Sequence, residues 1–185
     1  MIWVVALVLT LNQVPDVKMR FADGVPERIA QASEAFVKSR IGEERFNKNV
    51  LYSRGELDRD GHWAISFIYR IDSIDERLTF GLVMSSDPNI EEPLKVLGIP
   101  DCVSDSTECH FPFPRSVAVQ IAQAAGLKDS VRPLKVSLYW RTDPGTYAWE
   151  IMSTVGDDGV GALYHWCEID ANSGEVLALY YVNAN

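Results

Sequence analysis

The chain has 185 residues, of which 47% are hydrophobic, and a formal net charge of −9 at pH 7. A chain of this length can bury one medium-sized hydrophobic core or two small ones. Its negative charge repels phosphate groups, which argues against nucleic acid and anionic membrane surfaces as partners.

Residues 2–11 form an uninterrupted apolar run, which is too short to cross a bilayer as a helix of ~20 residues. Its length suits the apolar region of a signal peptide, although no Lys or Arg precedes it and no small-x-small cleavage site follows it. We expect residues 1–24 to be a degraded or truncated export signal or an N-terminal arm, and a buried first strand is the alternative for the apolar run. An export signal would make the protein periplasmic or extracellular, whereas its absence would leave it in the cytoplasm.

Residues 25–97 are predicted to form a helix followed by antiparallel strands. Pro26 suits the first turn of a helix, apolar residues then recur at helical spacing, and Gly42 suits the residue after its end. Alternating apolar residues predict strands at residues 49–57, 62–71 and 77–85. Turns are expected at residues 86–89 and at residues 58–61, where Asp-Arg-Asp-Gly resembles the start of a calcium loop but lacks its later oxygen ligands.

Residues 98–113 contain Pro and Gly at several positions and are predicted to link two halves of the chain. Cys102 and Cys109 bracket a polar loop that a disulfide would close in an oxidising compartment. Two unpaired thiols are the alternative. A zinc site formed by Cys102, Cys109 and His110 is a third interpretation, although the spacing of these residues matches no common zinc finger.

Residues 114–185 are predicted to form a second helix followed by strands. Pro114 opens the helix and Gly126 ends it, and alternating residues predict a strand over 134–140 and a turn at 142–145. The segment from Tyr147 to Val182 is predicted to be a three-stranded meander, with reversals at residues 156–159 and 171–174.

The two halves repeat the order of their features. Each begins with Pro at a helix start, continues through a strand into an Asp/Gly turn, and carries Trp-x-Ile in its second strand, at Trp63 and at Trp149. The copies lie roughly 85 residues apart, a period typical of duplicated supersecondary units. We therefore expect an α+β fold of two repeated units, residues 25–97 and 114–185, each a helix followed by an antiparallel meander.

The second half resembles the PepSY domain family. Trp149-Glu-Ile, followed by Ile169-Asp-Ala-Asn-Ser-Gly-Glu-Val-Leu, is similar to the family's W-x-V/I strand and closing I-D-A-x-T-G-E-V-L hairpin. Ser173 stands where the family most often has Thr, and either hydroxyl can hydrogen-bond within the turn. The resemblance covers residues 114–183. It implies a PepSY/cystatin-like fold, a signature turn at Asp170, Asn172 and Gly174, and association with a peptidase or regulation in the cell envelope.

The sequence contains no P-loop, dinucleotide fingerprint, HExxH or GxSxG motif. His165 and Cys167 point to one face of a strand, but no orienting carboxamide accompanies them, so we do not expect a catalytic pair. Glu150, Glu168 and Asp170 could gather across adjacent strands as an acid/base pair, but solvent-facing charges and a turn-forming Asp170 are the expected explanation. We expect no catalytic residue, no cofactor, no metal and no enzymatic activity.

The expected function is that of a non-catalytic, exported binding module that restrains or regulates a peptidase or another envelope protein. If it uses an open sheet face, the candidate partner-binding aromatics are Tyr139, Trp140, Tyr147 and Trp149, of which adjacent residues point to opposite faces. The alternative use of these rings is to fill the core. The alternative function is a cystatin/NTF2-like pocket domain that binds a small ligand, with weak enzymatic activity. A purely structural envelope protein is a third alternative.

Overall fold

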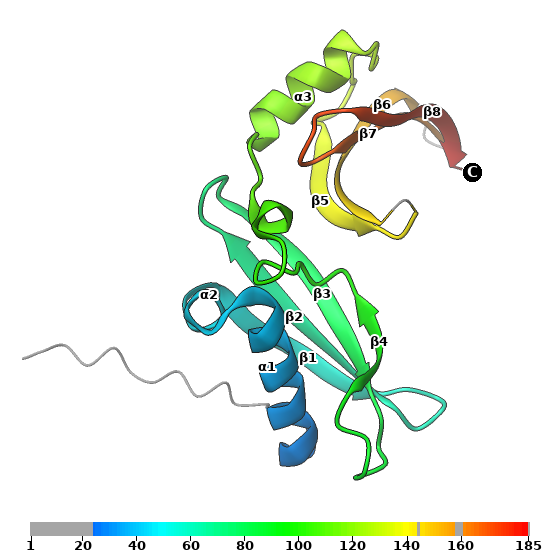
Figure 1. Ribbon diagram of the computed structural model, residues 1–185. Helices are drawn as coiled ribbons and strands as arrows, with labels where there is room; N and C mark the ends of the chain where they lie inside the picture. The colour runs from blue at the N-terminus through cyan, green and yellow to red at the C-terminus, as the bar shows by residue number, and fades with distance from the viewer. Residues whose placement is uncertain (1–23, 144, 158–160, 185) are drawn as a thin grey trace, which may run out of the picture.

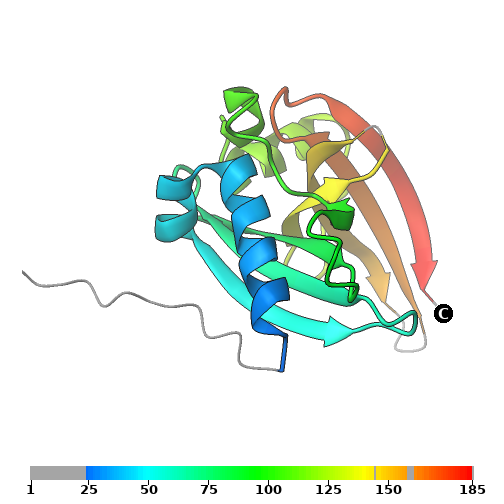
Figure 2. The same cartoon turned by 60° about the horizontal axis from the view of Figure 1, so that its bottom comes forward.

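The computed structural model describes residues 24–143, 145–157 and 161–184. Within them the chain has an α+β fold with three α-helices and two antiparallel four-stranded sheets (Figures 1 and 2). The first half contains α1 (Glu27–Ile41), α2 (Glu43–Asn49), β1 (Val50–Leu57), β2 (Trp63–Ile71), β3 (Glu76–Met84) and β4 (Pro93–Leu97). A short 3-10 helix (Ser106–Cys109) precedes α3 (Arg115–Ala124), β5 (Lys135–Arg141), β6 (Thr146–Asp157), β7 (Ala162–Asp170) and β8 (Val176–Ala184).

Some of the predicted features lie outside the described residues, namely the export signal within residues 1–23 and the turn residues Pro144, Asp158 and Gly159. Among the helices that the structure does describe, none combines the length and the hydropathy needed to cross a membrane.

Helix α1 covers one side of the first sheet, and the residues that pack it recur at helical spacing. Ile29, Ser33, Val37 and Ile41 are buried, as their spacing of four residues predicts. Gly42 follows α1 with a φ of 92°, a conformation that glycine adopts without a steric penalty. The predicted helix is confirmed, but α2, which follows directly, was not predicted. Its sequence has a single buried residue, Phe46, and so carries no amphipathic pattern.

The first sheet, β1–β4, has the strand order of the chain. In β2 and β3 every second residue is buried beneath the helices, which confirms the predicted strands, and these core residues are Ile65, Phe67, Tyr69, Ile71, Leu78, Phe80, Leu82 and Met84. Strand β4 was not predicted, because it pairs only with the end of β3 and four of its five residues are exposed.

The second sheet, β5–β8, also follows the chain order. The packed side of β6 carries Tyr147, Trp149 and Ile151, which are at most 1% exposed. Helix α3 contacts β6 and β7, and its small residues Ala118 and Ala122 are fully buried. The predicted strands are confirmed with one correction: β6 continues to Asp157, by way of an irregularity after Thr154, and so includes the first two residues of the reversal expected at 156–159.

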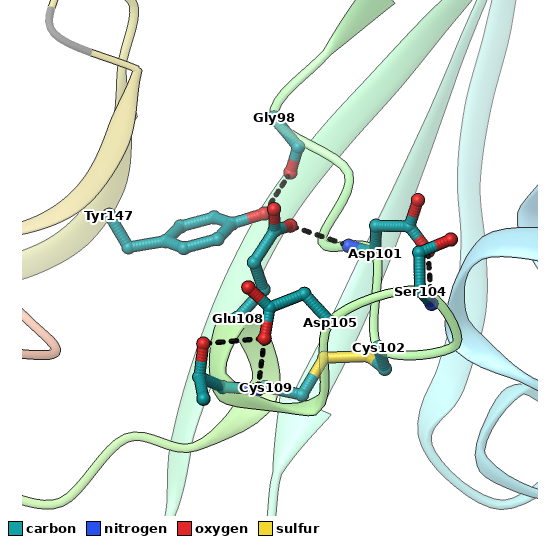
Figure 3. Close-up of a disulfide and its surroundings, with 9 residues drawn as sticks. Gly98, Asp101, Cys102, Ser104, Asp105, Glu108, Cys109 and Tyr147 are labelled. Carbon is teal, nitrogen blue, oxygen red and sulfur yellow. Dashed lines mark hydrogen bonds between the residues drawn. A yellow bond between two sulfur atoms is a disulfide. The ribbon is translucent and has the colours of Figure 1, made fainter.

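The segment of residues 98–113 is packed between the two halves. Ile99, Cys102 and Phe111 are buried, and the Tyr147 hydroxyl donates a hydrogen bond of 3.0 Å to the carbonyl of Gly98 (Figure 3). A Cβ at Gly98 would lie 2.5 Å from Cβ of Trp140, so this close approach requires glycine.

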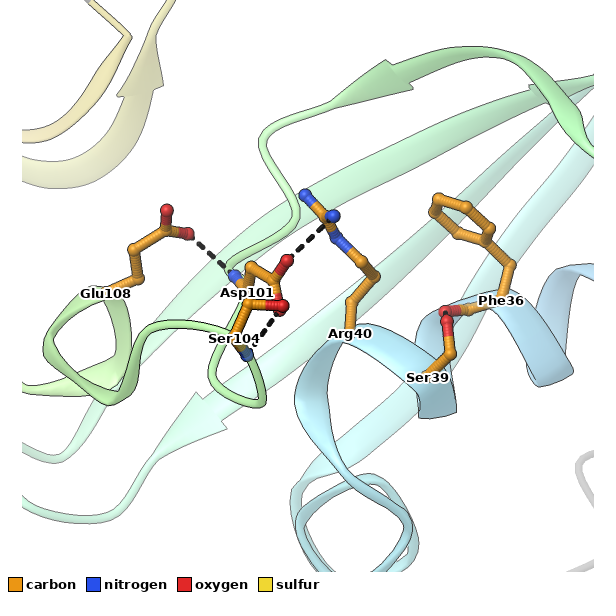
Figure 4. Close-up of polar contacts among 6 residues, drawn as sticks. All are labelled: Phe36, Ser39, Arg40, Asp101, Ser104 and Glu108. Carbon is orange, nitrogen blue, oxygen red and sulfur yellow. Dashed lines mark hydrogen bonds and ion pairs between the residues drawn. The ribbon is translucent and has the colours of Figure 1, made fainter.

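A disulfide between Cys102 and Cys109 closes the loop within this segment, with the two Cα atoms 5.4 Å apart (Figure 3). The loop is tied to α1 by an ion pair of 2.7 Å between Arg40 and Asp101 (Figure 4). The backbone N–H of Asp101 donates to Oε2 of Glu108 at 2.7 Å. The segment of residues 98–113 therefore bridges the end of α1 and the packed side of the second sheet.

The buried apolar residues of both halves form one contiguous cluster, from Ile29 in α1 to Ile169 in β7. The two Trp-x-Ile motifs occupy different positions in it. Trp63 is the first residue of β2 and only partly buried, whereas Trp149 is the fourth residue of β6 and fully buried.

Candidate functional site

The predicted partner-binding aromatics lie mostly on the packed side of the second sheet. Tyr147 is 1% exposed and Trp149 is not exposed, so neither side chain can reach a partner and both belong to the core. The ring of Trp140 packs edge-on against Tyr147 with 4.9 Å between centroids. Only Tyr139 faces the other way, because adjacent residues of a strand point to opposite faces.

The opposite side of the second sheet is concave: Figure 1 shows β5–β8 curled, with α3 outside the curl. Strand register brings to this side a set of aromatic and polar residues from all four strands. We call this set the open face, and its members are Ser137, Tyr139, Arg141, Glu150, Met152, Tyr164, Trp166, Glu168 and Tyr180. None of the described helices lies over it (Figures 1 and 2).

Part of the open face is hollowed into a cavity of about 540 Å³. Its lining combines apolar and aromatic side chains with one carboxyl group, two hydroxyl groups and one ammonium group, and consists of Lys135, Val136, Ser137, Glu150, Met152, Tyr164 and Trp166. A volume in this range suits a small molecule or one long side chain.

Glu168 is the centre of a hydrogen-bonded network on the open face. It is 8% exposed, its Oε2 lies 2.8 Å from Nη1 of Arg141, and its Oε1 accepts a hydrogen bond of 3.2 Å from the hydroxyl of Tyr180. The pKa of Tyr139 is raised mainly by burial and, to a smaller extent, by its hydrogen bond with Glu168. The pKa of Tyr180 is raised mainly by burial and, to a smaller extent, by the charge of Glu168. The guanidinium and the phenol hydroxyls therefore stabilise the Glu168 carboxylate.

Glu150 lies directly opposite Glu168 in the β6–β7 register, but its surroundings differ. It accepts one hydrogen bond of 3.3 Å from the hydroxyl of Ser137. Burial, together with the charge of Glu168, raises the pKa of Glu150 in spite of that hydrogen bond. Among the described residues, no Lys, Arg or His forms an ion pair with Glu150, so its negative charge is only partly compensated.

The predicted cluster of three carboxylates is thus realised in part. Glu150 and Glu168 come together, and the expectation that they are solvent-facing is wrong for Glu168, which is buried. Asp170 forms the β7–β8 turn, as expected. Its Oδ1 accepts from the backbone N–H of Asn172 and from the N–H and hydroxyl of Ser173, and its Oδ2 accepts from Thr146 at 2.6 Å.

Burial alone would raise the pKa of Asp170, but the hydrogen bonds from Thr146, Ser173 and Asn172 outweigh it and lower the pKa. Gly174 closes the turn with a φ of 78°, and the hydroxyl of Ser173 bonds locally as expected. The signature turn therefore has a structural role that its own contacts explain.

His165 and Cys167 lie on the packed side of β7. Cys167 is fully buried, and burial raises its thiol pKa to about 11. Nδ1 of His165 accepts a hydrogen bond of 3.1 Å from the backbone N–H of Lys128, and its ring stacks on Tyr181 with 4.1 Å between centroids. An inaccessible thiol and an imidazole engaged in this way do not form a nucleophile–base pair.

The described residues contain no group of three or more His, Cys, Asp or Glu side chains arranged to hold one metal ion. The zinc reading is wrong, because both loop cysteines are consumed by the disulfide. Asp58 makes a hairpin turn instead of a calcium loop: its Oδ1 accepts from the backbone N–H groups of Asp60 and His62.

Three aromatic residues of the open face, Tyr164, Trp166 and Tyr180, were not among the predicted candidates. Their signal was the alternation along β7 and β8, where Tyr164 and Trp166 are two residues apart and Trp166 pairs with Tyr180.

No protein-family model and no curated protein matches the chain.

Proposed function

We propose that the chain is a non-catalytic binding module that holds a segment of another protein on the open face. The observation that carries this proposal is a concave sheet face with four aromatic residues, Tyr139, Tyr164, Trp166 and Tyr180, that no described helix covers. A sheet normally buries its aromatic side chains against a second layer. Tyr and Trp on an uncovered face are typical of protein interfaces, in which they contribute much of the binding energy.

A protein partner is favoured over a small ligand by the edge strand β8, which borders the open face. Its nine residues include no charged side chain, and Val176, Leu179, Tyr180 and Tyr181 are exposed. Edge strands are ordinarily protected from pairing by charges, by Pro or by a covering element. An unprotected edge of this length is suited to accept an extended segment of a partner.

We further propose that the two halves are PepSY-like units and that the partner is a peptidase or another cell-envelope protein, which the module restrains or regulates. The support is the Asp170–Gly174 turn together with the order of elements, a helix and then a four-stranded meander, in each half. The unequal positions of Trp63 and Trp149 require that the copies have diverged. Export is supported by the disulfide, because such bonds persist in oxidising compartments.

The test is affinity capture from an envelope fraction followed by an inhibition assay with the captured peptidase. Replacing Tyr139 and Trp166 together by Ala should abolish capture and inhibition without lowering the melting temperature by more than a few degrees. Leu51→Ala, at an exposed position on the edge strand β1 of the first sheet, is the control and should leave capture unchanged. Equal capture by all three proteins would overturn the proposal.

The alternative is a pocket domain for a small ligand, and the cavity beside Glu150 is the observation that favours it. A thermal-shift screen of small molecules separates the two functions. A compound that stabilises the wild type, combined with no captured protein, would select the pocket domain.

A further inference from the structure

We propose that the cavity of the open face binds one basic side chain, a Lys or Arg of the segment held there. This inference rests on the proposed function, since the segment belongs to the protein partner. It specifies that the second sheet selects a partner segment with a positively charged side chain.

The charge arrangement favours a cation near Glu150. Glu150 and Glu168 are directly opposite each other on neighbouring strands, an arrangement that is destabilising for like charges. Arg141 and Tyr180 compensate Glu168, whereas Glu150 has only the hydroxyl of Ser137 at 3.3 Å. A cation in the cavity would complete the set of two carboxylates and two cations.

The remaining walls suit the stem and the head of a basic side chain. Tyr164 and Trp166 offer aromatic rings, which attract ammonium and guanidinium groups through cation–π interactions. Met152, which lines the same cavity, offers an apolar surface for the methylene stem of Lys or Arg. An acidic side chain would be repelled by Glu150, and a neutral one would leave that carboxylate uncompensated.

Lys135 is the competing group within the molecule. It lies on the same side of β5 as Ser137 and lines the cavity, but its side chain is exposed and it forms no ion pair with the described residues. The structure therefore places its ammonium group outside ion-pair distance of Glu150. Its positive charge opposes entry of a second cation, so removing it should strengthen binding.

The experiment uses four acetylated, amidated tripeptides that differ only in the central residue: Lys, Arg, norleucine or Glu. Binding to the full chain is followed by NMR chemical-shift changes, with the indole N–H of Trp166 as the local reporter. The Lys and Arg peptides should bind at least about tenfold more tightly than the norleucine peptide, the change expected for one charge-assisted contact. The Glu peptide should not bind.

Three variants make the test specific. Glu150→Gln should weaken binding of the Lys peptide about tenfold, and Lys135→Met should strengthen it. Glu175→Gln is the matched control, because it removes one negative charge from an exposed turn residue far from the cavity and should change nothing.

Equal affinities for the Lys and norleucine peptides, an unaffected Glu150→Gln variant, or the absence of binding by any peptide would each overturn the inference. Its failure is distinguishable from failure of the proposed function. If Glu150→Gln still captures and inhibits the partner while the Tyr139/Trp166 double variant does not, the open face is the interface and the cavity is not a basic-side-chain site.

Discussion

The two sheets are alike on their packed sides and differ on the sides that no helix covers. Phe67 in the first sheet and Trp149 in the second are both fully buried among apolar residues. The uncovered side of the first sheet carries small, aliphatic or polar residues on its two central strands, namely Ala64, Ser66, Ile68, Thr79 and Val83. The corresponding side of the second sheet carries four aromatic rings and a network of two carboxylates. Core formation explains the two packed sides, and contact with solvent explains the small and polar residues on the uncovered side of the first sheet. Only the uncovered side of the second sheet requires a further explanation, which is binding.

The largest expected effects test whether the packed sides are equivalent. Phe67→Ala and Trp149→Ala should each lower the free energy of unfolding by about 3–5 kcal/mol, because each leaves a cavity in a closed core. Urea denaturation measures both. If Trp149→Ala instead lost partner affinity at an unchanged melting temperature, Trp149 would be a contact residue and the comparison would fail.

The hairpin turns provide the next comparison. Asp170→Ala should cost about 2–3 kcal/mol, because the carboxylate accepts four hydrogen bonds, whereas Asp58→Ala, with two hydrogen bonds in an exposed turn, should cost about 1 kcal/mol. Asp170→Asn, which retains an acceptor, serves as the control.

The stabilisation by Asp170 also depends on pH. Because its folded pKa is lowered, the stabilisation is fully present above the ordinary value of 3.8 and is lost as the pH falls through the folded pKa. Acid titration of the unfolding free energy should therefore converge for the wild type and Asp170→Ala at low pH.

On the uncovered sides, stability effects should be small even where binding effects are large. Tyr180→Phe removes the hydrogen bond that Tyr180 donates to the Glu168 carboxylate. Because Tyr180 is 39% exposed, we expect a loss of stability of about 1 kcal/mol or less. Thr79→Val, on the first sheet, should remain within about 0.5 kcal/mol of the wild type. A cost of several kcal/mol for Tyr180→Phe would mean that the open face is structural.

The smallest expected effect concerns Glu150, for which only a direction is predicted. Its folded pKa is raised, so the wild type should lose stability relative to Glu150→Gln as the pH rises from its ordinary value of 4.5 through the folded pKa. The groups that face Glu150 are Ser137, Lys135 and Tyr139 on β5, Glu168 on β7 and Tyr180 on β8. Melting temperatures of the two proteins across this pH window provide the measurement, and a difference that does not vary with pH would contradict the prediction.

Most strands could be predicted because buried residues such as Leu78 and Phe80 alternate with the polar Arg77 and Thr79, and burial of one face demands that alternation. Helix α2, with Phe46 as its only buried residue, and the exposed strand β4 carry no such pattern. The side of the second sheet that remains open could not be predicted. Alternation separates Tyr139 from Trp140, but the segment of residues 98–113, whose Gly98 lies against Trp140, decides which of them is covered, and the position of that segment depends on tertiary packing. The pairing of Glu150 with Glu168 likewise depends on the β6–β7 register, which the irregularity after Thr154 changes farther along.

The packed segment between the sheets has a consequence for cooperativity. Ile99 and Phe111 in this segment belong to the same buried cluster as Ile41 of α1 and Tyr147 of β6. Neither half can therefore lose its structure without exposing apolar surface of the other half to water. The chain should unfold as one thermodynamic unit, with equal calorimetric and van't Hoff enthalpies, although its order of elements suggests two separable modules. A partner that binds the second sheet would then also protect backbone amides of the first sheet from hydrogen exchange, because exchange of those amides requires global unfolding of the chain.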